Sequence, residues 1–184
     1  MISTACKDDN EQLKKIWNVC FGDEDELIDR FLDVCRAENV LVYRDELTVV
    51  SSLYMVPMNN GTAIYLYALA TLPQYRRKGI MSSLICEALK LCRKSGADYA
   101  FLIPAEEELI KYYNNLGFTG RASLEAGKND FLVPDNAGIL KFVEWEEAQE
   151  TVSAPKELYG AENALLCSFK DDGIPSQISG FIPF

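Results

Sequence analysis

Three consecutive basic residues, Arg76-Arg77-Lys78, precede Gly79 in a part of the chain that otherwise carries no charge. No Asp or Glu occurs between Glu46 and Glu87, although the chain has 28 acidic residues and a formal net charge of −10. An apolar run precedes these basic residues and a helical pattern follows Gly79. A helix N-terminus attracts anions through its unpaired N–H groups and its dipole. The pattern therefore predicts a loop for a phosphate-bearing ligand, and an ordinary solvated strand-to-helix connection is the alternative.

The lack of histidine limits the chemistry that this chain can perform. Without an imidazole there is no Ser-His-Asp or Cys-His nucleophile and no histidine-based metal site, and we predict no bound metal. Six cysteines occur without a Cys-x-x-Cys pair, so we interpret them as reduced, mostly buried thiols. Any proton transfer therefore depends on carboxylate, tyrosine, cysteine, lysine or water.

Composition is typical of an acidic globular protein. The 184 residues are 48% hydrophobic, which predicts a single domain over 1–184. The net charge of −10 argues against a nucleic-acid binder and suits a cationic partner, although acidic proteins are common. The first residues do not resemble a secretory signal, and no apolar run is long enough to span a membrane. We therefore expect a cytoplasmic protein with no membrane partner.

Hydrophobic periodicity predicts the elements that position the basic loop. We expect helices over 9–21, 25–36 and 79–95, and strands over 1–6, 40–44, 48–58, 63–71 and 99–103. The Asn60-Gly61 turn favours an antiparallel hairpin between 48–58 and 63–71. The near-continuous apolar run over 99–103 indicates a buried strand parallel to 63–71. The ligand crevice should lie at the carboxyl ends of this parallel pair.

Signals beyond residue 103 are weaker. Pro104 is expected to open a helix that ends at Gly117, with three consecutive glutamates, 106–108, in its first turn. After that helix we expect a helix near 142–150, a strand over 164–169 and a turn at 172–173. Strands alternating with helices in this order predict a mixed α/β fold.

Two segments resemble the signatures of a known superfamily. The segment Leu72-Pro-Gln-Tyr-Arg-Arg-Lys-Gly-Ile-Met-Ser-Ser-Leu84 resembles motif A of the GNAT N-acetyltransferases, (Arg/Gln)-x-x-Gly-x-(Gly/Ala). Met81 replaces the last small residue, which is similar to the acetyltransferases related to the mycobacterial enhanced-intracellular-survival protein. Those proteins are longer, so this chain would correspond to their catalytic part. The segment Lys111-Tyr-Tyr-Asn-Asn-Leu-Gly-Phe118 resembles the second signature, a tyrosine four residues before Gly-Phe. The resemblance covers about residues 1–120.

The resemblance implies a GNAT-like fold of the α/β (α+β) class that binds acetyl-CoA. This fold is a mostly antiparallel, twisted sheet flanked by helices, with a central parallel strand pair splayed around the cofactor. Backbone groups of 69–71 would meet the pantetheine arm and the thioester carbonyl, and backbone groups of 77–82 would hold the pyrophosphate. The implied cofactor-binding residues are Leu69, Ala70, Thr71, Arg76, Arg77, Lys78, Gly79, Ile80, Met81 and Ser82.

The resemblance also implies that Tyr113 is the general acid, which would protonate the leaving CoA thiolate. The alternative is a tyrosine that packs in the core. Tyr112 is the natural control, because its spacing from Leu109 and Leu116 predicts that it lies on the more buried helix face.

The base is harder to identify. A free alkylamine has a pKa of about 10.4, so its proton must be removed near pH 7. Many GNAT enzymes use a glutamate on the strand before motif A, and this chain has none there. Glu106 is the best remaining carboxylate, because it precedes Tyr113 by seven residues and would share its helix face, roughly 10 Å away along the axis. The alternative role for Glu106 is a simple charge at the helix N-terminus. The alternative bases are a water chain to solvent and the C-terminal carboxylate of Phe184.

We therefore expect a cytosolic acyltransferase that moves an acetyl group from acetyl-CoA to a primary amine of a small molecule or peptide by direct attack. Residues 121–184 should supply closing strands and the acceptor side, and the acidic stretch 24–33 would attract a cationic acceptor or be merely solvated. A non-catalytic CoA-binding module, a transferase for longer acyl-CoA and a domain without ligand are the alternatives. Exposed late strands leave a homodimer open.

Overall fold

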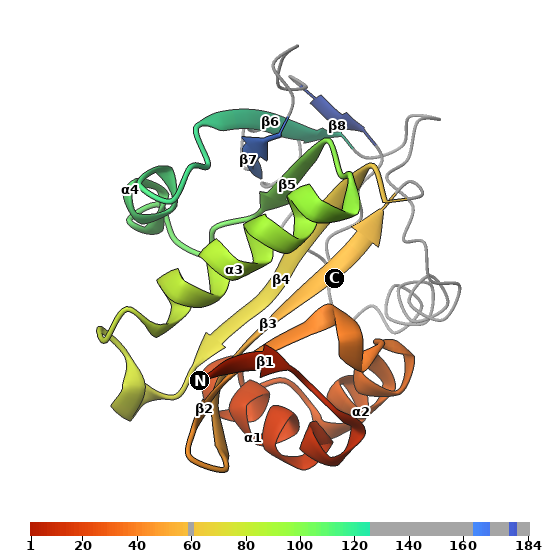
Figure 1. Cartoon of the computed structure of the whole chain (residues 1–184), viewed down its shortest axis with the longest axis vertical. Helices are drawn as coiled ribbons and strands as arrows, with labels where there is room; N and C mark the ends of the chain where they lie inside the picture. The colour runs from red at the N-terminus through yellow and green to blue at the C-terminus, as the bar shows by residue number, and fades with distance from the viewer. Residues whose placement is uncertain (59–60, 126–163, 170–176, 180–184) are drawn as a thin grey trace. The chain divides into compact units, whose positions relative to one another are not determined.

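Two long neighbouring strands form the centre of the fold and have the bounds that the sequence predicts. They are β3 (Thr48–Met58) and β4 (Ala63–Thr71), which lie side by side and run in opposite directions (Figure 1). The computed structural model describes residues 1–58, 61–125, 164–169 and 177–179. The chain divides into two compact units. The first consists of Met1–Val56 and Leu66–Lys90, and the second of Pro57–Tyr65 and Leu91–Phe184.

In the first unit the strand order is β1-β2-β3-β4. The antiparallel pairing of β1 with β2 and of β2 with β3 is regular except for a register shift between Tyr43 and Arg44. The predicted strand near the N-terminus and the predicted helices are confirmed, with bounds that differ by at most two residues. The elements are β1 (Ile2–Thr4), η1 (Lys7–Asp9), α1 (Asn10–Cys20), α2 (Asp25–Val34), η2 (Ala37–Asn39), β2 (Val40–Asp45), η3 (Pro73–Tyr75) and α3 (Ile80–Ser95).

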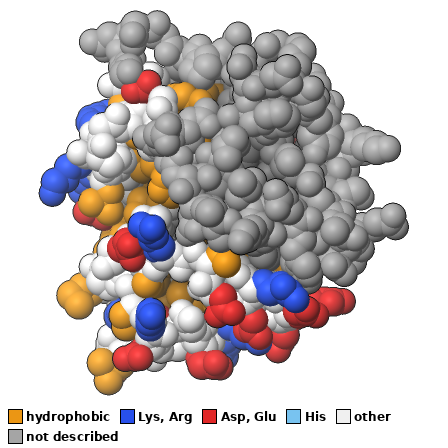
Figure 2. Space-filling model, turned by 90° about the vertical axis from the view of Figure 1, so that its right-hand side faces the viewer, with side chains coloured by type: hydrophobic (Ala, Val, Ile, Leu, Met, Phe, Trp, Pro, Cys, Tyr) orange, Lys and Arg blue, Asp and Glu red, His pale blue; other side chains and the backbone are white. Residues whose placement is uncertain are grey.

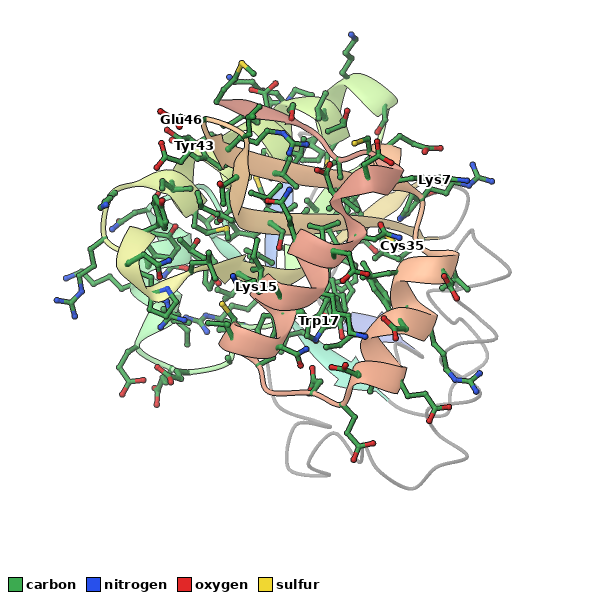
Figure 3. The ribbon with its side chains drawn as sticks, turned by 90° about the horizontal axis from the view of Figure 1, so that it is seen from below. Lys7, Lys15, Trp17, Cys35, Tyr43 and Glu46 are labelled. Atoms are coloured by element: carbon green, nitrogen blue, oxygen red, sulfur yellow. The ribbon has the colours of Figure 1, made fainter. Side chains whose placement is uncertain are left out.

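Aromatic rings build the core between the first two helices and the strands of this unit. Trp17 lies on α1 (Figure 3). Its ring contacts that of Phe31 on α2, with centroids 5.1 Å apart. Both rings also pack on Tyr54 of β3, each at 5.4 Å. The Trp17 indole N–H donates to Asp23 at 2.6 Å, so its polar edge is satisfied. Burial of three large rings contributes several kcal/mol and fixes both helices on this part of the sheet.

A buried ion pair fastens the N-terminal segment to β2. Arg44 donates two hydrogen bonds to the carboxylate of Asp9, at 2.9 and 2.7 Å. The Cys6 amide donates a third at 2.7 Å, and Asp9 is only 3% exposed. These hydrogen bonds, with that from Arg44 the strongest, lower the pKa of Asp9 to about 2. The carboxylate is therefore ionised at all but very acidic pH.

In the second unit the first residues of β4 pair in parallel with β5 (Tyr99–Leu102). β5 pairs antiparallel with β7 (Ala164–Ser168), which pairs antiparallel with β6 (Gly120–Glu125), and β6 pairs in parallel with β8 (Gln177–Ser179). The predicted parallel pair, the strand over 164–169 and the mixed, mostly antiparallel sheet are thus confirmed. The predicted helix near 142–150, the turn at 172–173 and the first residue of the Asn60-Gly61 turn lie outside the described residues.

The helix predicted from Pro104 to Gly117 is wrong at both ends, because α4 covers only Leu109–Asn114. The segment before it forms turns. The N–H of Leu109 bonds to the Glu106 carbonyl at 3.1 Å, and the N–H of Ile110 to the Glu107 carbonyl at 3.0 Å, each spanning three residues rather than four. Hydrogen bonds with this three-residue spacing are of the tighter 3₁₀ type, which forms short turns rather than a continuous α-helix.

All six cysteines are free thiols, as the sequence predicts. The expectation that most of them are buried is wrong, because only Cys92 and Cys167 are buried, and Cys6 and Cys86 are exposed. Within the described part of the chain, no helix is both long enough and apolar enough to cross a membrane.

Candidate active site

Strand β4 leaves regular β conformation before it reaches the basic loop. Its parallel pairing with β5 covers Ala63–Tyr65, the first three of nine residues. Further along, Ala68 has a φ of +45°, in the left-handed region that residues other than glycine rarely adopt. Such a residue persists only where the surrounding structure holds it, and it is typical of functional sites. The strand is thus distorted directly before Leu69–Thr71, the backbone predicted to meet pantetheine.

The last two residues of β4 are held by side chains from elsewhere in the first unit. The Ser51 hydroxyl donates to the Ala70 carbonyl at 2.7 Å and lies 2.8 Å from the Thr71 hydroxyl. The Thr71 carbonyl accepts from Arg76 Nε at 3.0 Å. Both carbonyls therefore already accept hydrogen bonds from side chains. The sequence reasoning missed Ser51, whose only signal is a polar residue inside an apolar strand.

The basic loop has the geometry of an anion-binding turn. Arg77 and Gly79 have φ values of +62° and +75°, and α3 starts immediately afterwards. The first intrahelical bond runs from the Ser83 N–H to the Gly79 carbonyl at 3.0 Å, so the N–H groups of Ile80 and Met81 have no acceptor within the helix. Open space surrounds the position of a Cβ on Gly79. The backbone can therefore approach an anion there.

The three basic side chains of the loop have different surroundings, although all are exposed. Arg76 turns back onto the end of β4, where Nη2 also lies 3.8 Å from Cys20 Sγ. The Lys78 ammonium lies 4.9 Å from the centre of the Tyr75 ring, a cation–π contact. Arg77 carries the strained backbone of the loop. Their summed charge raises the local anion concentration whichever way each side chain points.

In the second unit, Tyr113 is covered by a reversal of the chain. At Gly117, with a φ of +102°, the chain turns back, and the Phe118 N–H donates to the Tyr113 carbonyl at 3.2 Å. The Phe118 ring meets the Tyr113 ring edge-on at 6.1 Å. Tyr113 is therefore 8% exposed, and Tyr112 is only half-buried. The prediction that Tyr112 lies on the more buried face is wrong, because helical spacing takes no account of this turn.

The environment of Tyr113 keeps its hydroxyl protonated. Burial, and to a smaller extent the Tyr112 phenol, raises the pKa of Tyr113 to about 12. Burial also raises the pKa of Tyr65, which stacks on Phe101 at 4.9 Å, and the Tyr113 phenol adds to that shift. Both hydroxyls can donate a proton at neutral pH, and neither is suited to accept one.

Glu106 does not have the position that its candidacy as a base assumed. It is exposed and lies in the turn before α4, so it does not share a helix face with Tyr113 two turns away. The spacing argument for Glu106 is therefore wrong, and its role as a base stays a prediction.

The acidic stretch predicted to attract a cationic acceptor lies on and before α2. Acidic side chains gather with some basic ones on the lower part of the face in Figure 2. Asp25 and Asp29 both contact the Lys14 ammonium, at 3.2 and 2.7 Å, and Glu26 pairs with Arg30 at 3.0 Å. Because these acidic side chains already pair with basic side chains of the same surface, the interpretation of 24–33 as a merely solvated stretch is favoured over that of a site for a cationic acceptor.

Comparison with known proteins agrees with this fold. The acetyltransferase (GNAT) domain profile matches residues 1–120. A GNAT family acetyltransferase from Brucella melitensis in complex with acetyl-CoA has a TM-score of 0.50 and 19% identity, covering 61% of this chain and 80% of that one. Rv2747 from Mycobacterium tuberculosis, in complex with CoA, has a TM-score of 0.60 and 11% identity, covering 92% and 99%. Eis1 from Mycobacterium abscessus has a TM-score of 0.53 and 14% identity, covering 67% and 32%.

Several matched structures are much longer than this chain, which spans between 31% and 43% of their length. No curated protein sequence is significantly similar to it. At these identities the likeness concerns the fold, and the sequence profile carries the assignment.

Proposed function

This chain belongs to the GNAT acetyltransferase family, and from that premise we propose that it transfers an acetyl group from acetyl-CoA to a primary amine by direct attack. The acceptor is proposed to be a small-molecule or peptide amine, and the compartment the cytosol, because the six cysteines are all free thiols.

The geometry of the basic loop is the observation that carries the proposal. Arg77 and Gly79 in left-handed conformation direct the chain into α3, a helix of 16 residues. The backbone N–H groups at its start would hold the pyrophosphate, and the positive charge of 76–78 would attract it. The large side chain of Met81 is compatible with this role, because backbone donors do not depend on side-chain type.

In the proposed reaction the amine nitrogen attacks the thioester carbonyl carbon, a C–N bond forms and the C–S bond breaks. Tyr113 donates its phenolic proton to the leaving thiolate, as its protonated state at neutral pH supports. The proton lost by the amine returns to the phenolate through water. A protonated amine must first lose a proton, and Glu106 or a water chain would take it.

Ligand-dependent stability tests the cofactor assignment. Acetyl-CoA or CoA at about a hundred times its dissociation constant should add about 2.7 kcal/mol of stability, which raises the melting temperature by roughly 5–10 °C for a chain of this size. NADH, which also carries an adenine nucleotide and a pyrophosphate, should give no shift. No shift with either CoA species would refute the acetyltransferase proposal.

The alternative is a module that binds CoA without transfer, and one observation favours it. The strand before the basic loop carries no carboxylate, since no Asp or Glu occurs between Glu46 and Glu87. Acetyl-CoA binding without thiol release, across amine acceptors that include aminoglycosides, polyamines and peptide N-termini, would support this alternative.

A further inference from the structure

Ser51 is a buried hydroxyl whose hydrogen bonds all reach toward the predicted cofactor strand. It is 0% exposed in β3, next to Ser52 at 1%, and the other residues around this pair are apolar. Buried hydroxyls are retained where they have a hydrogen-bond partner. For Ser51 the partners are the Ala70 carbonyl at 2.7 Å and the Thr71 hydroxyl at 2.8 Å.

Thr71 is also held from its other side. Its carbonyl accepts from Arg76 Nε at 3.0 Å and from the Cys20 thiol at 3.5 Å. We call Ser51, Thr71, Arg76 and Cys20 the Thr71 network. It joins α1, β3, β4 and the basic loop at one residue. The bond between Arg76 and Thr71 joins residues five positions apart, so the position of Arg77 depends on where Thr71 is fixed.

We propose that Ser51 and Arg76 are positioning residues for acetyl-CoA, which act through Thr71 rather than by touching the ligand. The proposal rests on the proposed function. Two strained residues, Ala68 and Arg77, lie on either side of the network, and left-handed conformations persist only when neighbouring groups hold them. Because the network fixes the backbone between them, it sets the direction of the amides on both sides of Thr71.

Two substitutions of Arg76 separate positioning from contact with phosphate. The donor to Thr71 is Nε, which is bonded to Cδ, and the side-chain amide nitrogen of glutamine is bonded to Cδ as well. Arg76→Gln therefore keeps a donor in place and loses the charge, whereas Arg76→Ala loses both. If Arg76 acts by positioning, the alanine variant should bind acetyl-CoA about tenfold more weakly than wild type, and the glutamine variant, which keeps the donor to Thr71, should bind clearly more tightly than the alanine variant.

The Ser51 contribution has a matched control in the same strand. Ser51→Ala should weaken acetyl-CoA binding about tenfold by calorimetry, and Ser52→Ala should leave it within about twofold. Without ligand, amide hydrogen exchange over 69–79 should speed up in Ser51→Ala and not in Ser52→Ala. Thr71→Val, which removes the partner hydroxyl without a change of shape, should weaken binding several-fold and covers the case in which Ser51→Ala does not fold.

The outcomes are distinct. If the wild-type chain does not bind acetyl-CoA, the proposed function fails. If it binds and Ser51→Ala and Thr71→Val bind equally well, the positioning role of Ser51 is refuted and the proposed function stands. If Arg76→Gln loses as much affinity as Arg76→Ala, Arg76 acts through its charge on the ligand.

Discussion

Replacing Tyr113 with phenylalanine tests the chemical step, and the structure predicts both a rate and a pH dependence. The substitution removes the hydroxyl and keeps the ring that packs against Phe118. A general acid contributes about 10²–10⁴-fold, so kcat should fall by at least about a hundredfold while acetyl-CoA affinity stays unchanged. Tyr112→Phe is the matched control on the neighbouring, half-buried ring, and it should change kcat less than about twofold.

The pH dependence follows from the raised pKa of Tyr113, about 12. A tyrosine of ordinary pKa, about 10, is half ionised at pH 10, whereas a group of pKa 12 is roughly 1% ionised there. The acid should therefore remain protonated throughout the accessible range. With wild-type protein, kcat should show no alkaline fall up to pH 10.

The rate of thiol release from acetyl-CoA measures both the loss of kcat in Tyr113→Phe and the pH dependence of kcat in the wild-type protein. The acceptor amine should have a low pKa, so that the substrate itself does not titrate between pH 8 and 10. A fall in kcat centred near pH 10, absent from the Tyr113→Phe variant, would show that burial does not protect the acid. An unchanged rate in Tyr113→Phe would refute its role altogether.

Gly79→Ala places a side chain at a φ of +75°, so it should cost about 1 to 2 kcal/mol of stability and weaken acetyl-CoA binding measured by calorimetry. Gly96→Ala, at a φ of +86° beyond the other end of α3, is the control. It should cost as much stability and leave the dissociation constant for acetyl-CoA unchanged. Asp9→Asn removes the countercharge of Arg44 and should cost about 3 kcal/mol in urea unfolding at pH 7. Because the pKa of Asp9 is lowered to about 2, wild-type protein should lose about 2 kcal/mol as the pH falls from about 4 to 2, and the asparagine variant should not show this loss. Phe31→Ala should cost about 3 to 5 kcal/mol in the same assay, because it opens a cavity in the aromatic core.

The sequence predicts the long elements well, because their signals are local. β3 and β4 have the predicted bounds, and α3 differs from its prediction by one residue. Alternation, turn residues and helical periodicity each depend on neighbours a few positions apart. The parallel pairing of β4 with β5 was also predictable, from the apolar character of the second strand.

Features that depend on distant contacts were not predictable. The burial of Tyr113 depends on the chain reversal at Gly117, which overrides the helix-face argument for Tyr112. The proposed role of Ser51 depends on a hydrogen bond to a residue 19 positions away. Likewise, the residue type of Arg77 does not indicate its left-handed conformation, because residues other than glycine rarely adopt it.

The division of the chain into two units has a consequence for its synthesis. Neither unit is one continuous stretch, because residues 57–65 belong with the C-terminal part and residues 66–90 with the N-terminal part. During translation the first unit cannot be completed until Lys90 has been synthesised. By then residues 57–65, which belong to the second unit, have already been synthesised. No single cut in the backbone would therefore release either unit intact.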